Sequence, residues 1–442
     1  MTIQVTLGTL MSTYIPVPSV PEIVSEWASL IPLACHLASP KDDHFTSGDV
    51  SLHGRISLII FPRLGTLWGL GRLFSKGSNY FDYASVKGGA ARTVWDVNWG
   101  SEFPCANGAA SAAIEDFALR RLMDQTGVIP KLSIPISDSY VTTSSTKTPL
   151  NKGSDEAPKI RKQILHVYQF RFCQPRRSIR VKINSFMRSR IPTALIFIIL
   201  CGISAIFGLV GAYGSAGLIL ITAISRLVAW AIVIPRSAGY LSNNEKHDIA
   251  YMLAASHVNA TEWSLYTGDR AIVDTLLNKP MVHFPEGKQA QLVARWFYFA
   301  HALQLVAITY VAAQKGWDGI CLVCVLFVHS LYNWTLCGNA KAADWMAREG
   351  IEVKVKSYEF GWRTAMLGCI QVFSESKVTR WMDSIVVPHV RRDAFLGVIQ
   401  GNELEKCLEV QFDEYDLNWI NNAAALSVQG GEVLKRDFGV GK

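Results

Sequence analysis

The sequence lacks the short motifs that identify common catalytic and nucleotide-binding sites. It contains no GxxxxGK[ST] phosphate loop, no GxSxG nucleophile turn, no GxGxxG fingerprint after a predicted strand and no HExxH pair. A DDxxD motif, which is typical of metal-dependent prenyl transfer, is also absent. These absences disfavour a nucleotide-driven pump and a familiar prenyl transferase, and they leave the catalytic residues of any activity unknown.

Acidic residues are absent from four long apolar runs at 192–213, 216–234, 296–314 and 319–337, where Arg226 is the only formal charge. A helix needs roughly 20 apolar residues to cross the hydrocarbon core of a bilayer. The four runs therefore predict a mainly α fold, a multi-pass helical membrane protein made of two transmembrane hairpins. The chain also contains cytosolic α+β structure in this prediction.

Basic residues predict the orientation. Six of them precede the first run: Arg176, Arg177, Arg180, Lys182, Arg188 and Arg190. Such residues stay on the cytosolic side of a span. The connections inside both hairpins are only a few residues long. We therefore expect both termini in the cytosol and almost nothing on the far side of an internal membrane such as the endoplasmic reticulum.

The net charge of +7 lies largely beside the apolar runs. That distribution suits an anionic lipid surface and argues against a nucleic-acid partner. The nine cysteines, several of them inside or beside the runs, indicate reduced thiols. Cys321 and Cys324 have the spacing of half a zinc site but no second pair nearby, so we predict packing, no metal and no cofactor.

Composition divides the chain into four regions. They are an N-terminal cytosolic or interfacial region at 1–136, a disordered Ser/Thr/Lys/Pro-rich linker at 137–160, a membrane domain at 161–338 with a cytosolic loop at 235–295, and a C-terminal cytosolic region at 339–442. We expect helices at 21–37, 109–125, 340–348 and 363–373, and a strand at 351–360. The stretch 52–75 fits either an interfacial helix or a buried hairpin.

Five polar side chains fall in one layer of the predicted spans. Arg226, Gln304 and His329 each lie eight residues from a cytosolic span end, which is about 12 Å of helix. His301 and Asn333 lie one turn from Gln304 and His329. Two interpretations stay open: hydrogen bonding between helices with Arg226 reaching toward headgroups, or a binding pocket for a lipophilic anionic small molecule.

The loop between the hairpins is a secondary candidate site. Histidines and carboxylates, the groups suited to metal binding and acid–base work, gather there: His247, Asp248, His257, Glu262, Asp269 and Asp274. Their spacing matches no ligand pattern, and 271–278 reads as a short helix with an apolar docking face. We therefore favour a structural role for these charged residues over metal binding or acid–base catalysis.

Four stretches of the second half carry a resemblance. They read HVNATEWSLYTGDRAIVDTLLNKPM, WFYFAHALQLVAITYVAAQKGWDG, VKSYEFGWRT and SKVTRWMDSIVVPHVRRDAF. Together they resemble a family of multi-spanning fungal membrane proteins that has no established activity. The resemblance covers about residues 190–400. It implies a fungal membrane protein and transfers no catalytic residue.

Three functional hypotheses follow. The first is an accessory or scaffold component of a fungal membrane-associated pathway, such as one of specialised metabolism. The alternative is a membrane-embedded enzyme that acts on a lipophilic anionic substrate. The third is a small-molecule transporter, which would require a homo-oligomer because four spans are few and the hairpins show no inverted repeat.

Overall fold

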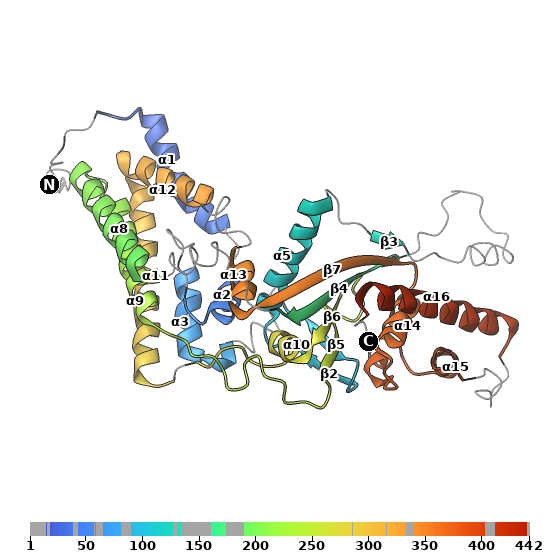
Figure 1. Cartoon of the computed structure of the whole chain (residues 1–442). Helices are drawn as coiled ribbons and strands as arrows, with labels where there is room; N and C mark the ends of the chain where they lie inside the picture. Colours follow the sequence, from blue (N-terminus) through green and yellow to red (C-terminus); the bar gives the residue numbers. More distant parts are fainter. Residues whose placement is uncertain are drawn as a thin grey trace, which may run out of the picture.

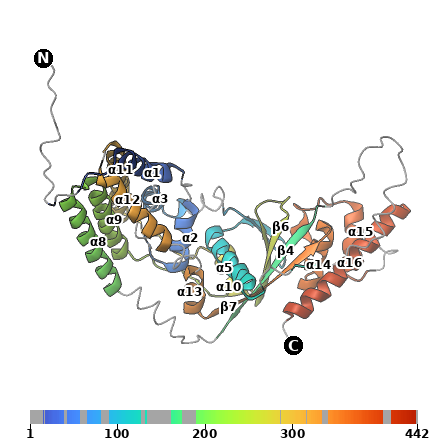
Figure 2. The same cartoon turned by 90° about the horizontal axis from the view of Figure 1, so that it is seen from above.

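The computed structural model describes residues 15, 18–38, 43–56, 58, 65–80, 90–126, 131–133, 161–173, 190–284, 286–314, 316–332, 340–402 and 412–439. Most of these residues are helical, and seven strands form one sheet. Two parts lie side by side, a helical part and a sheet part, with further helices at the far end of the sheet (Figure 1). The view from above shows the same order (Figure 2).

The antiparallel pair α8–α9 and four further helices form the helical part (Figure 1). Their bounds are α8 Arg190–Val210, α9 Tyr213–Ala231, α11 Lys288–Ala313, α12 Trp317–Tyr332, α1 Glu22–Ala38 and α3 Thr66–Lys76. Helix α8 packs on α9, α3 packs on the first half of α11, and α1 packs on α12. We call the end formed by the α8–α9 and α11–α12 connections the turn end of this part.

Each of the four predicted apolar runs contains a helix, although the described residues 211–212, 232–234 and 314 of these runs lie outside the helices. Two of the helices, Tyr213–Ala231 and Lys288–Ala313, are long and apolar enough to cross a membrane. The apolar segments Ala194–Val210 and Trp317–Leu331 are shorter. Membrane association is thereby supported, whereas the number of four spans stays a prediction.

Large apolar side chains on these helices face outward. Exposed examples are Ile198 and Ile206 on α8, Val306 on α11, and Phe327 and Val328 on α12. Soluble monomers rarely expose contiguous apolar surface of this kind, because water around it is unfavourable. The outward faces are therefore suited to contact with lipid.

The sheet has the strand order β2-β1-β5-β6-β4-β7-β3. Its strands are β1 Thr93–Asp96, β2 Ser101–Pro104, β3 Lys131–Ser133, β4 Gln163–Phe172, β5 Ile249–Ala255, β6 Glu262–Asp269 and β7 Ile351–Phe360. The pairs β4–β6 and β3–β7 are parallel, and the others are antiparallel. In the longest pair, Gln163 lies opposite Phe360 and Phe172 opposite Ile351.

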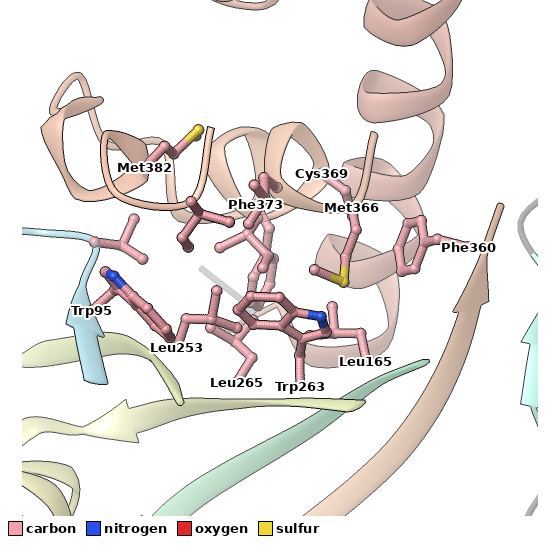
Figure 3. Packing of buried hydrophobic residues seen from close by; sticks show 14 of the residues in the cluster. Trp95, Leu165, Leu253, Trp263, Leu265, Phe360, Met366, Cys369, Phe373 and Met382 are labelled. Atoms are coloured by element: carbon pink, nitrogen blue, oxygen red, sulfur yellow. The ribbon is translucent and has the colours of Figure 1, made fainter. Parts of the chain in front are cut away.

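Helices cover both faces of the sheet. On one face, α14 Arg363–Ser374, α15 Val390–Ile399 and α16 Glu414–Phe438 close a core around Trp95, Trp263 and Met366 (Figure 3). On the other face pack α2 Asp43–His53, α5 Gly108–Thr126, α10 Arg270–Leu277 and α13 Ala340–Glu349. Successive residues of β4 serve opposite cores: Val167 faces the first core, whereas Tyr168 faces the second.

The joint between the two parts uses the last carbonyls of α2. The guanidinium of Arg236, just after α9, donates to the carbonyl oxygens of Ser51 and Leu52, and Arg348 of α13 donates to Leu52 at 3.0 Å. The last carbonyls of a helix have no partner within the helix. The two arginines therefore connect α2, α9 and α13 at one point.

The predicted helices at 21–37, 109–125, 340–348 and 363–373 and the strand at 351–360 are confirmed by α1, α5, α13, α14 and β7. The single sheet takes strands from the N-terminal region, from both sides of the first hairpin, and from the C-terminal region. The predicted linker at 137–160 lies outside the described residues.

Candidate functional site

Arg226 lies on α9 and binds backbone. Its Nη1 donates a hydrogen bond to the carbonyl oxygen of Leu58. The chain reaches Leu58 by way of Gly54, whose carbonyl accepts from the backbone N–H of Ile234 at 3.1 Å and whose φ is +63°. A side chain at Gly54 would be strained in that conformation. Arg226 therefore holds a segment that runs alongside the second half of α9.

Helix α3 packs closely on α11. A Cβ atom at Gly71 would lie 2.8 Å from the ring of Tyr298, and the hydroxyls of Ser75 and Tyr298 are 3.0 Å apart. The ring of Trp68 lies 5.7 Å from that of His301. His301 and Arg226 thus both contact the predicted stretch 52–75, which buries the apolar face of α3 against α11.

The other members of the predicted polar layer are distributed differently. Gln304 is 2% exposed on α11, one turn beyond His301. His329 is buried on α12, a helix whose main neighbour is α1. Asn333 lies outside the described residues. Two of the five residues, Arg226 and His301, are therefore brought to one segment.

Asp318 is a structural anchor that the sequence analysis does not single out. Its Oδ2 accepts from the N–H of Gly214 at 2.8 Å, and its Oδ1 accepts from the N–H of Ser215 at 2.7 Å. Free N–H groups and the helix dipole make the start of α9 a favourable place for a carboxylate. A Cβ at Gly214 would lie 2.5 Å from Val311, so glycine permits the approach. Asp318 joins the two hairpins at the turn end.

The six loop residues have separate surroundings. The His247 ring lies 5.1 Å from Trp99, the Asp248 carbonyl accepts from the N–H of Arg270 at 2.9 Å, and His257 Nδ1 accepts from the N–H of Asn259 at 3.1 Å. Glu262, the first residue of β6, is exposed, and Asp269 Oδ2 accepts from the N–H of Phe172 at 2.8 Å. Within the described ranges, no group of three His, Cys, Asp or Glu side chains could hold a metal ion.

Asp274 belongs to a buried ionic cluster. Arg270, 2% exposed, lies 2.7 Å from Asp96 Oδ2 and 3.4 Å from Asp274 Oδ2. Burial raises the pKa of Asp274, and the nearby charges of Arg270 and Lys279 oppose that rise. Asp96 Oδ1 also accepts from the N–H groups of Asn98 and Trp99 at 2.8 and 3.2 Å. The cluster fixes α10 to the β1–β2 turn, which is a structural role.

A cleft of about 590 Å³ opens beside that turn, against the 3₁₀ helix Arg380–Met382. Its lining residues are Trp99, Gly100, Ser101, Glu102, Arg380, Trp381, Asp383 and Ser384. Ser384 accepts from Trp95 Nε1 at 2.9 Å, and Asp383 pairs with Arg392 at 2.6 Å, so neither side chain is arranged as a nucleophile or its base. The cleft offers an aromatic surface with charges of both signs, which is suited to binding.

Comparison of the chain with family models, curated protein sequences and solved structures finds no match. The resemblance to multi-spanning fungal proteins therefore stays an expectation.

Proposed function

We propose that the chain is an accessory or scaffold protein without catalytic activity, anchored by its helical part in an internal membrane such as the endoplasmic reticulum. In this proposal the sheet part lies in the cytosol and binds a partner of a membrane-associated pathway. The outward apolar faces of α8, α11 and α12 support the anchorage. Lipid is then the first partner of the protein, and a pathway protein is the second.

The contact between Arg226 and Leu58 carries the proposal. A pocket for an anionic amphiphile would direct the guanidinium toward the ligand, because charge–charge contact is the source of affinity. Here a donor of that guanidinium binds a backbone carbonyl of the chain itself. Irregular backbone is tolerated at membrane depth only when such groups are satisfied by protein or water. The charge therefore serves the fold of the segment around Leu58.

The cleft beside the β1–β2 turn is the binding surface of the proposed scaffold. Strand β2 is an end strand of the sheet, and three of its four residues are exposed. End strands accept extended segments of partners through main-chain hydrogen bonds. Trp99 is 46% exposed and provides an aromatic contact beside Glu102 and Arg380. We propose that an extended partner segment with charges of both signs binds there.

A deletion strain of the source organism tests the proposal by profiling lipids and metabolites. Trp99→Ala combined with Arg380→Glu should reproduce the deletion profile at unchanged protein abundance. Arg121→Glu, which changes an exposed arginine of α5, is the matched control and should behave as wild type. Gln304→Ala should also behave as wild type at matched abundance. Wild-type behaviour of the cleft variant would refute the scaffold proposal.

One observation favours the second candidate, a membrane enzyme acting on a lipophilic anionic substrate. His301 and buried Gln304 share a face of α11, and Arg226 lies on α9, which packs against that helix. For this candidate, Gln304→Ala and Arg226→Lys should each cause one precursor to accumulate while the protein stays abundant. The same profiling experiment therefore distinguishes the two candidates.

A further inference from the structure

Helix α1 packs on α12 at very short range. A Cβ atom at Gly319, near the start of α12, would lie 2.5 Å from the backbone N of Ser29 and 2.7 Å from the carbonyl carbon of Ala28. Only glycine permits two helix backbones to approach so closely. Figures 1 and 2 show the two helices side by side. The contact therefore fixes α1 against the turn-end half of α12.

The residues that precede α1 lie at the turn end. Trp317, the first residue of α12, donates from Nε1 to the carbonyl oxygen of Pro18 at 2.8 Å. The N–H of Ile15 donates to the carbonyl oxygen of Leu209, at the end of α8, at 3.3 Å. Trp317 and Leu209 both belong to the turn end, so Pro18 and Ile15 lie there too.

The opposite ends of α1 and α12 lead to the sheet part. Helix α2 follows α1 along the chain, helix α13 follows α12, and α2 packs on α13. The two helices therefore run in the same direction, from the turn end to the sheet part. They also match in length: 17 and 16 residues correspond to about 25 Å of helix each.

The outer face of α1 carries large apolar side chains together with the exposed Glu26 of its second turn, and its inner face carries hydroxyls. Ile23, Trp27 and Leu30 are 67%, 68% and 54% exposed and follow the i, i+4, i+7 spacing of one helix face. The buried hydroxyls of Ser25 and Ser29 donate to the carbonyls of Glu22 and Glu26 at 2.8 Å. This distribution is the reverse of that in a helix on a water-soluble surface. The carboxylates of α1 lie in its first two turns, at the turn end.

We infer that α1 is a further membrane-embedded helix, parallel to α12, whose Ile23–Trp27–Leu30 face contacts lipid acyl chains. Lipid is the occupant because this face adjoins α12, which exposes Phe327 and Val328 in the same way. The residues before α1 and the sheet part then lie on opposite sides of the membrane. This inference rests on the membrane anchorage proposed above, and it replaces the expectation that both termini share the cytosol.

Glycosylation mapping of the full-length chain in microsomes tests the inference. An acceptor tag joined to Met1 should be modified, whereas a tag at Lys442 and the natural acceptor sequence at Asn259, in the sheet part, should not. Release of the chain by alkaline carbonate would refute the anchorage itself. Retention of the chain with both end tags on one side would overturn only the inference about α1. Modification at Asn259 and Lys442, but not at Met1, would reverse the orientation and leave the crossing of α1 intact.

Two variants connect the result to the structure. Gly319→Val should reduce the modified fraction of the Met1 tag severalfold, because its side chain collides with the backbone of α1. Gly202→Val on α8 is the matched control, since a Cβ there meets nothing within 4 Å. Leu30→Lys places a charge on the lipid face and should have the same effect as Gly319→Val without altering a packed residue. An unchanged modified fraction in Leu30→Lys would show that this face is in water.

Discussion

The two parts of the molecule neutralise buried charge in different ways. In the sheet part, the guanidinium of Arg270 lies between two carboxylates, 2.7 Å from Asp96 and 3.4 Å from Asp274. In the helical part, Arg226 donates to the Leu58 carbonyl and Asp318 accepts from two N–H groups of α9. Arg270 is thus neutralised by opposite charges, whereas Arg226 and Asp318 are partnered by backbone groups.

The different partners of the buried charges follow from the free-energy costs of burial in a protein core and in membrane hydrocarbon. A buried ion pair requires that both ions lose their water, and its attraction compensates only when the geometry is good. In hydrocarbon a second charge adds a further cost, while backbone groups outside regular helix need partners in any case. A single charged side chain that hydrogen-bonds to these backbone groups gives them partners and avoids the cost of a second charge. The charges of the helical part are therefore connectors between segments distant in the sequence.

The substitution with the largest predicted effect removes the central cation of the ionic cluster in the sheet part. Arg270→Met removes the cation that pairs with Asp96 and leaves Asp274 only the more distant Lys279. We expect a loss of about 3–5 kcal/mol in the free energy of unfolding. Denaturant unfolding of the purified protein in micelles measures it. Adding Asp274→Leu to Arg270→Met should recover part of the loss. A single variant as stable as wild type would contradict the assigned role of the cluster.

The next effect tests the connection at the turn end. Asp318→Ala removes the acceptor of two N–H groups and should lower the free energy of unfolding by about 2 kcal/mol. Asp318→Asn keeps one acceptor oxygen and should lose about half as much. The melting temperature in micelles, measured for both variants, provides the comparison. Equal stability of alanine, asparagine and wild type would show that the cap contributes nothing.

A smaller effect tests the partner of Arg226. Arg226→Leu leaves the Leu58 carbonyl without this donor and should cost about 1–2 kcal/mol. Arg226→Lys keeps a donor and should lie between leucine and wild type. Thermal unfolding in micelles ranks the three proteins. If Arg226→Leu is the most stable, the cost of a charge in hydrocarbon outweighs its contact with the segment around Leu58.

The smallest effect concerns pH and the docking of α16. Burial acts to raise the pKa of Asp437, but the hydrogen bond from Tyr358 at 2.7 Å and the Lys356 ammonium at 3.0 Å outweigh it and lower that pKa. A carboxyl group whose pKa is lowered by folding stabilises the fold at pH values above its unfolded-state pKa, near about 3.9. This stabilisation is lost as the pH falls. Asp437→Asn should therefore cost about 1 kcal/mol at neutral pH and less below pH 4. Unfolding curves at pH 7 and pH 3.5 measure it, and a cost that grows toward acid would contradict the assignment.

Local sequence pattern predicted the helices and one strand of this fold. It did not predict the strand pairs, because their members come from distant parts of the chain. The apolar runs and the alternation of Glu352, Lys354 and Lys356 are visible within ten or twenty residues. Strands β5 and β6 fall in a stretch interpreted as a loop, because both are buried on two faces and show no clean alternation. Their positions depend on β1 and β4, which come from other regions of the chain.

The same limit applies to the candidate sites. Arg226 attracted attention as the lone charge of the apolar runs, but its partner is a carbonyl 168 residues away. Carbonyl groups carry no sequence signal. No local pattern marks Asp318, because its partners are more than 100 residues earlier. The cleft forms only when residues 99–102 meet residues 380–384.

Strand β4 has a consequence for synthesis of the protein. Its neighbours in the sheet are β6 and β7, and Ile351 of β7 leaves the ribosome long after Phe172. At ordinary translation speeds, residues 173–350 take roughly 10–40 s to make. During that interval the edge of β4 that pairs with β7 stays open, and such edges are prone to wrong pairing. A chain truncated after residue 338 would therefore retain every predicted span yet carry an unfinished sheet, so we expect cellular quality control to degrade it.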